Sequence, residues 1–169
     1  MTNCANSCSQ YCPLTSGAMP ARRLDSQRLL AAVNAQRAEL GLPDWAGSVT
    51  SGALGAACAE AVIAAVDEGR EPQREALRGA VLHTLDLMAT RAPGRAVEVR
   101  VPPYGAVQAI EGPRHTRGTP PNVVEADART WVLLACGRLS WAAAVSAGSV
   151  RPSGPRSDLT GYLPLWSPG

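Results

Sequence analysis

Apolar residues in the first half of the chain recur at helical spacing. Three segments follow this period, and each ends near a glycine or a proline, as helices commonly do. The third carries one apolar stripe, formed by Leu77, Val81, Leu85 and Met88. We expect helices over Ser26 to Leu40 (with Ser26 as the N-cap), over Ser51 to Glu68, and over Pro72 to Arg91.

Beyond residue 92 the period changes from helical to two. In Val97 to Val101 three valines alternate with two charged residues, which is the pattern of a half-buried strand. The turn sequence Pro-Pro-Tyr-Gly follows, and a second strand is expected over Ala106 to Glu111. We therefore expect the two strands to pair as an antiparallel hairpin. Val123 to Ala126 is a short third strand.

The last part of the chain returns to short helices. Asp127 is a favourable N-cap for a helix that reaches Cys136, and Ser140 for one over Trp141 to Ala147. A short strand at Val150 and an apolar segment over Asp158 to Leu165 complete the order. Strands in a run, with helices before and after, predict an α+β fold in which helices cover one face of a mainly antiparallel sheet.

The same pattern divides the chain into three parts. The first is a polar tail that we expect to be disordered, and Met19, at its end, is an alternative start of the patterned sequence. A helical segment and an α+β domain follow. We expect the boundaries at residues 1–20, 21–70 and 71–169.

Composition narrows the class of protein. The chain has 169 residues, of which 46% are hydrophobic and 18% charged, and its net charge is only +2. Charge alone therefore does not favour a nucleic-acid binder. No apolar run reaches the length of a membrane span, and the first residues do not resemble a secretory signal, so we expect a cytoplasmic location. All sixteen Lys and Arg positions are Arg, which GC-rich codons explain more simply than a phosphate-binding surface does.

The five cysteines do not indicate a disulfide framework, because their number is odd. Cys58 and Cys136 lie in apolar helical patterns and are expected in the core. A metal site at the evenly spaced Cys4, Cys8 and Cys12 is a weaker alternative to a simple tail, since no second pair of ligands is evident. We expect neither a metal nor another cofactor.

Two segments of the second half resemble a known family. Residues 131–150, WVLLACGRLSWAAAVSAGSV, are similar to the pattern of sterol carrier protein 2, in which a helix ends in a turn of Gly, Lys or Arg, and Leu before a second short helix and a strand. Residues 97–122, with the run GPRHTRGTPPN, resemble the bacterial, mostly actinobacterial, branch of these proteins. The resemblance covers roughly Glu75 to Leu165. It implies a twisted sheet covered by helices, with an apolar tunnel between the layers.

The resemblance also implies a ligand, because members of the wider family bind sterols, acyl chains or other lipids. The apolar residues that we expect to line such a site are Val99, Val107, Trp131, Leu134, Trp141 and Val145. The same six residues also suit an ordinary core. The chain contains no Phe, which is a departure from the large apolar linings of the family.

The loop after the second strand is the candidate polar site. Arg114, His115 and Arg117 place two guanidinium groups and an imidazole beside glycines, a set that binds a carboxylate or phosphate head group. The simpler interpretation is that the loop packs on its own domain, with Arg117 paired to Glu111 or Glu125. His83, within the third helix, is expected to be a packing or surface residue.

These features favour a cytoplasmic protein that binds or carries a lipid or other apolar small molecule. The chain has no Gly-x-Ser-x-Gly elbow, P-loop or dinucleotide fingerprint, so we do not expect an enzyme. The alternative is an interaction or regulatory module that docks a protein partner, or a second copy of itself, through the N-terminal helices. A weaker alternative is a small-molecule enzyme centred on the Arg114–Arg117 loop.

Overall fold

The computed structural model describes residues 25–112 and 122–167 of the chain. Within these ranges it contains five α-helices and a four-stranded mixed sheet, and the α+β class expected from the sequence is confirmed. The tail at residues 1–20, the three cysteines in it and Met19 lie outside the described residues.

The first three helices occur close to their expected positions, but one cap is different. They are α1 (Ser26–Glu39), α2 (Ser51–Asp67) and α3 (Arg74–Arg91). The N-cap of α1 is Asp25, not Ser26: the Asp25 carboxylate accepts the backbone N–H of Arg28 at 2.8 Å. A carboxylate at this position also interacts favourably with the positive end of the helix dipole, which a hydroxyl does less well.

Two glycines let these helices approach one another closely. A Cβ atom at Gly55 of α2 would lie 2.8 Å from Cβ of His83 on α3. A Cβ atom at Gly79 of α3 would lie 2.7 Å from Sγ of Cys58 on α2. The α2–α3 interface therefore depends on the missing side chains of these two glycines.

The burial of His83 predicts that the stability of the protein depends on pH. Burial lowers the pKa of His83 below its ordinary value of 6.5, and the charge of Asp86 opposes this only in part. Below about pH 6.5 the unfolded chain therefore takes up a proton at His83 that the folded chain resists. We expect the free energy of unfolding to fall from pH 7.5 to pH 5.5 by less in His83→Gln than in the wild type. Urea unfolding at both pH values measures this, and an equal loss in the two proteins would contradict it.

The sheet contains β1 (Val97–Val101), β2 (Gly105–Ala109), β3 (Val123–Ala126) and β4 (Val150–Ser153), in the order β2-β1-β3-β4. The expected hairpin is present, since β1 and β2 pair antiparallel with Val99 opposite Val107. β3 pairs antiparallel with β4 but parallel with β1. The sheet is therefore mainly antiparallel, as expected, but its central pair of strands, β1 and β3, is parallel.

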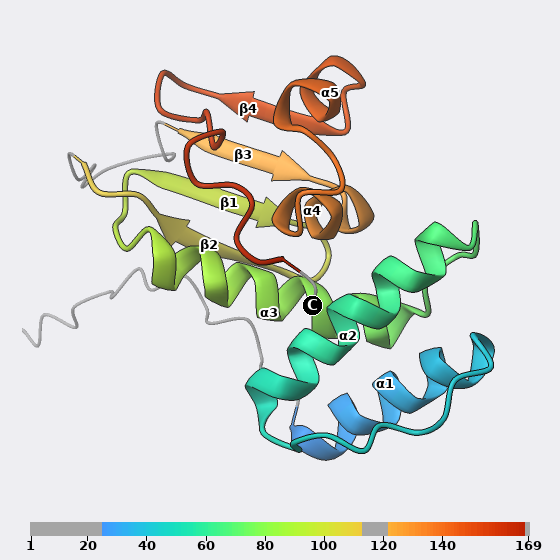
Figure 1. Cartoon of the computed structure of the whole chain (residues 1–169). Coiled ribbons are helices and arrows are strands. Elements are labelled where there is room, and N and C mark those ends of the chain that lie inside the picture. Colours follow the sequence, from blue (N-terminus) through green and yellow to red (C-terminus); the bar gives the residue numbers. More distant parts are fainter. Residues whose placement is uncertain (1–24, 113–121, 168–169) are drawn as a thin grey trace, which may run out of the picture.

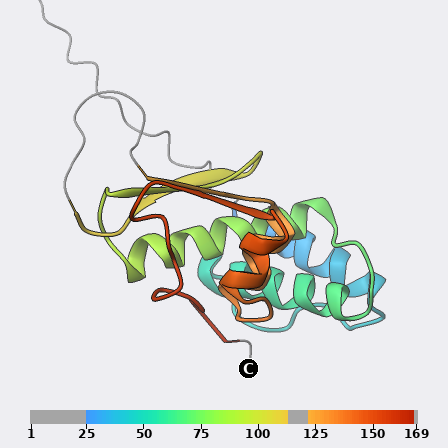
Figure 2. The same ribbon diagram turned by 90° about the horizontal axis from the view of Figure 1, so that it is seen from above.

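The two faces of the sheet have different environments, and all described helices lie on one of them (Figure 2). Val97, Val99 and Val101 of β1 are buried on the helical face. On the opposite face Arg100 donates to Glu98 at 2.9 Å. The alternating residues of β1 therefore face the core and the open side of the sheet in turn.

One buried indole joins α3 to α4 (Ala128–Ala135), the helix that follows β3. The side chain of Trp131 is fully buried, and its Nε1 donates to Oγ1 of Thr84 at 3.0 Å. The Thr84 hydroxyl in turn donates to the carbonyl of Ala80 at 2.8 Å. Every polar atom of this contact has a partner, so the core tolerates it.

The C-terminal segment runs from β4 back over α3 and α4 in a mostly irregular conformation (Figure 1). Arg91, at the end of α3, donates to the carbonyls of Pro164 and Leu165 at 2.9 and 3.2 Å. The carbonyl of Ala135, at the end of α4, accepts the N–H groups of Leu165 and Trp166. The segment is therefore held by the exposed ends of two helices, and it buries Leu165 and Leu159.

α1 is connected to the remainder of the fold by a buried amide. Gln36 is fully buried, and its side-chain oxygen accepts the backbone N–H of Gln73, the N-cap of α3, at 2.6 Å. The buried apolar residues of α1, α2, α3 and the sheet form one cluster. The division of the chain at residue 70 stays a prediction.

Candidate functional site

A surface groove lies between α5 (Trp141–Ser146) and the segment from Pro152 to Asp158, which includes the end of β4 and the loop after it. The cavity has a volume of about 470 Å³, within the range of roughly 300–1,000 Å³ that is usual for small-molecule sites. We call it the α5–β4 groove. It is lined by Trp141, Ala142, Val145, Ser146, Pro152, Gly154, Pro155, Ser157 and Asp158.

Local sequence signals position the helical wall of the groove. Ser140 begins α5, because its hydroxyl accepts the backbone N–H of Ala143 at 3.2 Å. Trp141 and Val145 are four residues apart, so they share one face of the helix, and both are half-buried. Ala144 faces the core instead. The helix thus presents an indole and an isopropyl group to the groove.

The opposite wall comes from β4 and the loop after it. Gly148 has φ +71°, a conformation that favours glycine, and it ends the helix so that the chain returns as β4. Pro152, at the edge of the sheet, lies on the helical side of β4, because Arg151 and Ser153 alternate to the open face. Ser157 then turns the chain: its hydroxyl donates to the carbonyl of Gly154 at 2.7 Å.

The six apolar residues predicted to bind a ligand occupy three different places. Three lie within the core, each 1% exposed or less: Val99, Trp131 and Leu134. Val107 is half-buried on the edge strand β2, where it packs against the core. Trp141 and Val145 line the groove. The structure therefore brings together only two of the six in a solvent-accessible site.

The polar candidates Arg114, His115 and Arg117 lie outside the described residues. Sequence reasoning did not identify the second wall of the groove, from Pro152 to Asp158. Its signal was present, because two prolines around a glycine follow a short strand, and a short connection from α5 to β4 must bring the two close together.

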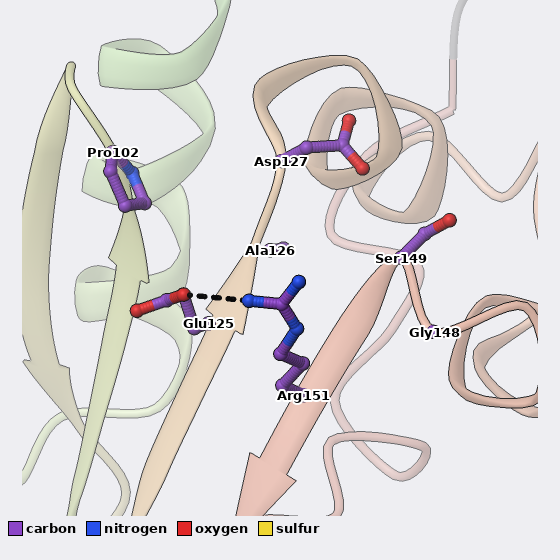
Figure 3. A pocket seen from close by; sticks show the side chains of 7 residues that line it. All are labelled: Pro102, Glu125, Ala126, Asp127, Gly148, Ser149 and Arg151. Carbon is purple, nitrogen blue, oxygen red and sulfur yellow. Dashed lines mark hydrogen bonds and ion pairs between the residues drawn. The ribbon is translucent and has the colours of Figure 1, made fainter.

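A smaller hollow of about 240 Å³ lies at the end of β3, between β1 and β4 (Figure 3). Its charged groups are already engaged with their neighbours. The Arg151 guanidinium pairs with Glu125 at 3.5 Å, as Figure 3 shows, and the Asp127 carboxylate caps α4 by accepting the N–H of Thr130 at 2.9 Å. These interactions stabilise β3, β4 and α4, and the hollow is a weaker candidate than the groove.

The two described cysteines have the properties of core residues. Burial raises the pKa of the Cys58 thiol to about 12 and also raises that of Cys136. Both thiols therefore stay protonated at neutral pH, and a protonated thiol is a poor nucleophile. Among the described residues no group of His, Cys, Asp and Glu side chains is arranged to hold a metal ion. No described helix is long and apolar enough to cross a membrane.

A match to a known protein family covers both the sheet and the α5–β4 groove. Residues 73–165 match the family described as bacterial SCP ortholog, where SCP denotes sterol carrier protein. The chain belongs to this family. The matched region begins at the N-cap of α3 and includes the whole sheet, α4 and the α5–β4 groove, while α1 and α2 precede it. The sequence matches no curated protein.

Proposed function

We propose that the protein binds a lipid or another apolar small molecule in the α5–β4 groove and carries it reversibly. Membership of the sterol carrier family supports binding of hydrophobic ligands in general. The observation that carries the proposal is a cavity of about 470 Å³ whose walls are an indole, a valine and two prolines. Each methylene that leaves water contributes about 0.8 kcal/mol, so even a short chain gains from such a surface.

The groove is also suited to binding without covalent chemistry. In the described part of the chain its lining has no thiol or imidazole, and the two described cysteines are protonated core residues. Sterol-carrier-like families are generally non-enzymatic, which supports this interpretation. We therefore propose a carrier and not an enzyme.

Filling the groove is expected to weaken the binding of an apolar ligand. Ala142 is an exposed residue of the lining, so Ala142→Trp places a second indole in the cavity with little effect on the core. The indole displaces at least two ligand methylenes, about 1.6 kcal/mol, and we expect at least a tenfold loss of affinity. Fluorescence titration with N-phenyl-1-naphthylamine, a neutral probe that brightens in apolar surroundings, measures the change.

The matched control is Val49→Ser, which removes an exposed apolar side chain from the connector between α1 and α2. Its affinity for the probe should equal that of the wild type. Equal binding by Ala142→Trp and the wild type would place the ligand elsewhere, and absence of binding by the wild type would overturn the proposed function.

A second candidate function is docking of a protein partner or of a second copy through the N-terminal helices. Leu42 and Val49 favour it, because these large apolar side chains are 43% and 59% exposed in the α1–α2 connector. This function becomes the better one if the wild type binds no apolar probe. The head-group role of Arg114, His115 and Arg117 stays a prediction.

A further inference from the structure

One acidic residue, Asp158, is among the described residues that line the α5–β4 groove. Asp158 is the one charged residue among those that line the cavity, and it is exposed to solvent at the end of the second wall. Among the described residues the lining contains no Arg or His, and the chain has no Lys. The described residues of the lining therefore carry one negative charge and no positive charge.

The Asp158 carboxylate has a fixed orientation. Its Oδ1 atom accepts the backbone N–H of Thr160 at 2.8 Å and the Thr160 hydroxyl at 2.6 Å. This is the geometry of an Asx turn, in which an aspartate holds the backbone two residues further on. In the described part of the chain no hydrogen bond or ion pair engages the other oxygen, Oδ2. One oxygen thus fixes the group and the second is available to a ligand.

The same hydrogen bonds keep the group ionised. Those from the Thr160 side chain and backbone lower the pKa of Asp158 below its ordinary value, and desolvation opposes them only slightly. A carboxylate that is already ionised needs no proton transfer before it pairs with a cation.

The nearest arginines along the chain are directed elsewhere. Arg151 lies on the open face of the sheet and pairs with Glu125 at 3.5 Å. The guanidinium of Arg156 lies over Gly112, where a Cβ atom would be 3.1 Å from its Nη1. Among the described residues, neither neutralises the charge at the end of the groove.

We propose that the groove selects amphiphiles with an apolar chain and an ammonium group, and disfavours fatty carboxylates of the same length. This selectivity rests on the proposed function, because the apolar chain must first occupy the groove. The ammonium group pairs with the free oxygen of Asp158, whereas a carboxylate is repelled by it. The pair is near the surface, so the expected advantage of ammonium over a neutral head group is about fivefold.

Three ligands with one chain length test the proposal. Octylammonium, octanol and octanoate share the apolar tail and differ only in the charge of the head group. We would measure the affinity of each at pH 7 by isothermal titration calorimetry, for the wild type and for Asp158→Asn. Asparagine retains the oxygen that Thr160 binds, so the turn is preserved while the charge is lost. Asp44→Asn, at an exposed site in the α1–α2 connector, is the control for net charge.

The expected order in the wild type and in Asp44→Asn is octylammonium, then octanol, then octanoate. In Asp158→Asn octylammonium should bind no better than octanol. Equal affinities for the three ligands in the wild type, or an order that survives Asp158→Asn, would overturn the selectivity and leave the proposed function in place. Failure of all three ligands, octanol included, would overturn both.

Discussion

Replacement of Trp131 by alanine is expected to lower the free energy of unfolding by about 3–5 kcal/mol. The indole is fully buried between α3 and α4, and its removal leaves a cavity that the surrounding helices cannot fill. The Thr84 hydroxyl still donates to the carbonyl of Ala80, so the loss comes mainly from apolar burial and not from an unpaired polar group. Urea unfolding followed by far-ultraviolet circular dichroism gives the free energy directly.

Trp141→Ala is the matched control, because the same residue type is replaced on the wall of the groove. Trp141 is only half-buried, and we expect this variant to lose about 1 kcal/mol. The two variants should also differ in function, since Trp141→Ala remains folded but binds an apolar probe more weakly. Equal destabilisation by the two changes would show that the division between core and groove is wrong.

Gly94→Ala is expected to cost about 3 kcal/mol or more, or to prevent folding. A Cβ atom at this position would lie 2.0 Å from the carbonyl oxygen of Ile110 and 2.4 Å from the backbone nitrogen of Glu111. Both neighbours are backbone atoms, so no side-chain rotation relieves the overlap. Gly94 also has φ +156°, a conformation that residues with a Cβ rarely adopt.

The backbone cannot move away because Ile110 is held from two sides. Its N–H donates to the carbonyl of Ala92 at 2.7 Å, and its own carbonyl accepts the N–H of Ala96 at 3.0 Å. Ile110 has φ +67°, which costs a β-branched residue about 1–3 kcal/mol, and its side chain is buried. Displacement of this segment would break both hydrogen bonds and separate α3 from the start of the sheet.

Gly52→Ala is the control for this second change. Gly52 lies in the first turn of α2, and nothing is within 4 Å of the Cβ that the substitution adds. Because alanine favours a helix over glycine, this variant should be as stable as the wild type or more stable by up to about 1 kcal/mol. Urea unfolding of both variants compares them, and a Gly94→Ala protein as stable as Gly52→Ala would contradict the expected clash.

The secondary structure was largely predictable because it depends on local patterns. The alternation in Val97–Val101 predicts a strand with one buried face, and the short turn after it allows only an antiparallel return, as observed. The Asp127 cap was identified correctly for the same reason, since a cap acts within one turn. The predicted N-cap of α1 was wrong by one residue. Asp25 and Ser26 are adjacent and both suit an N-cap, and the sequence pattern does not show which of them takes that position.

The candidate site was only half predictable. Trp131 and Trp141 both follow a cap and begin an apolar helical face, so the sequence treats them alike, yet one is fully buried and the other borders a cavity. Burial in the core and burial against a ligand select the same residue types. The chain from Pro152 to Asp158 carries few apolar side chains, and its place in the groove follows from the return of β4 beside α5.

The sequence by itself determined the order of helices and strands, the first hairpin, the α+β class and the resemblance to sterol carrier proteins. The elements, the hairpin and the fold class depend on residues close together in the chain, which side-chain periodicity records, whereas the resemblance rests on the motifs at residues 97–122 and 131–150. Only the tertiary structure decided that β1 and β3 pair in parallel, that three of the six apolar candidates belong to the core, and that Trp141 and Asp158 line the same groove. Periodicity shows which side of its own element a residue occupies, whereas a cavity is formed by several elements whose relative positions are set by packing.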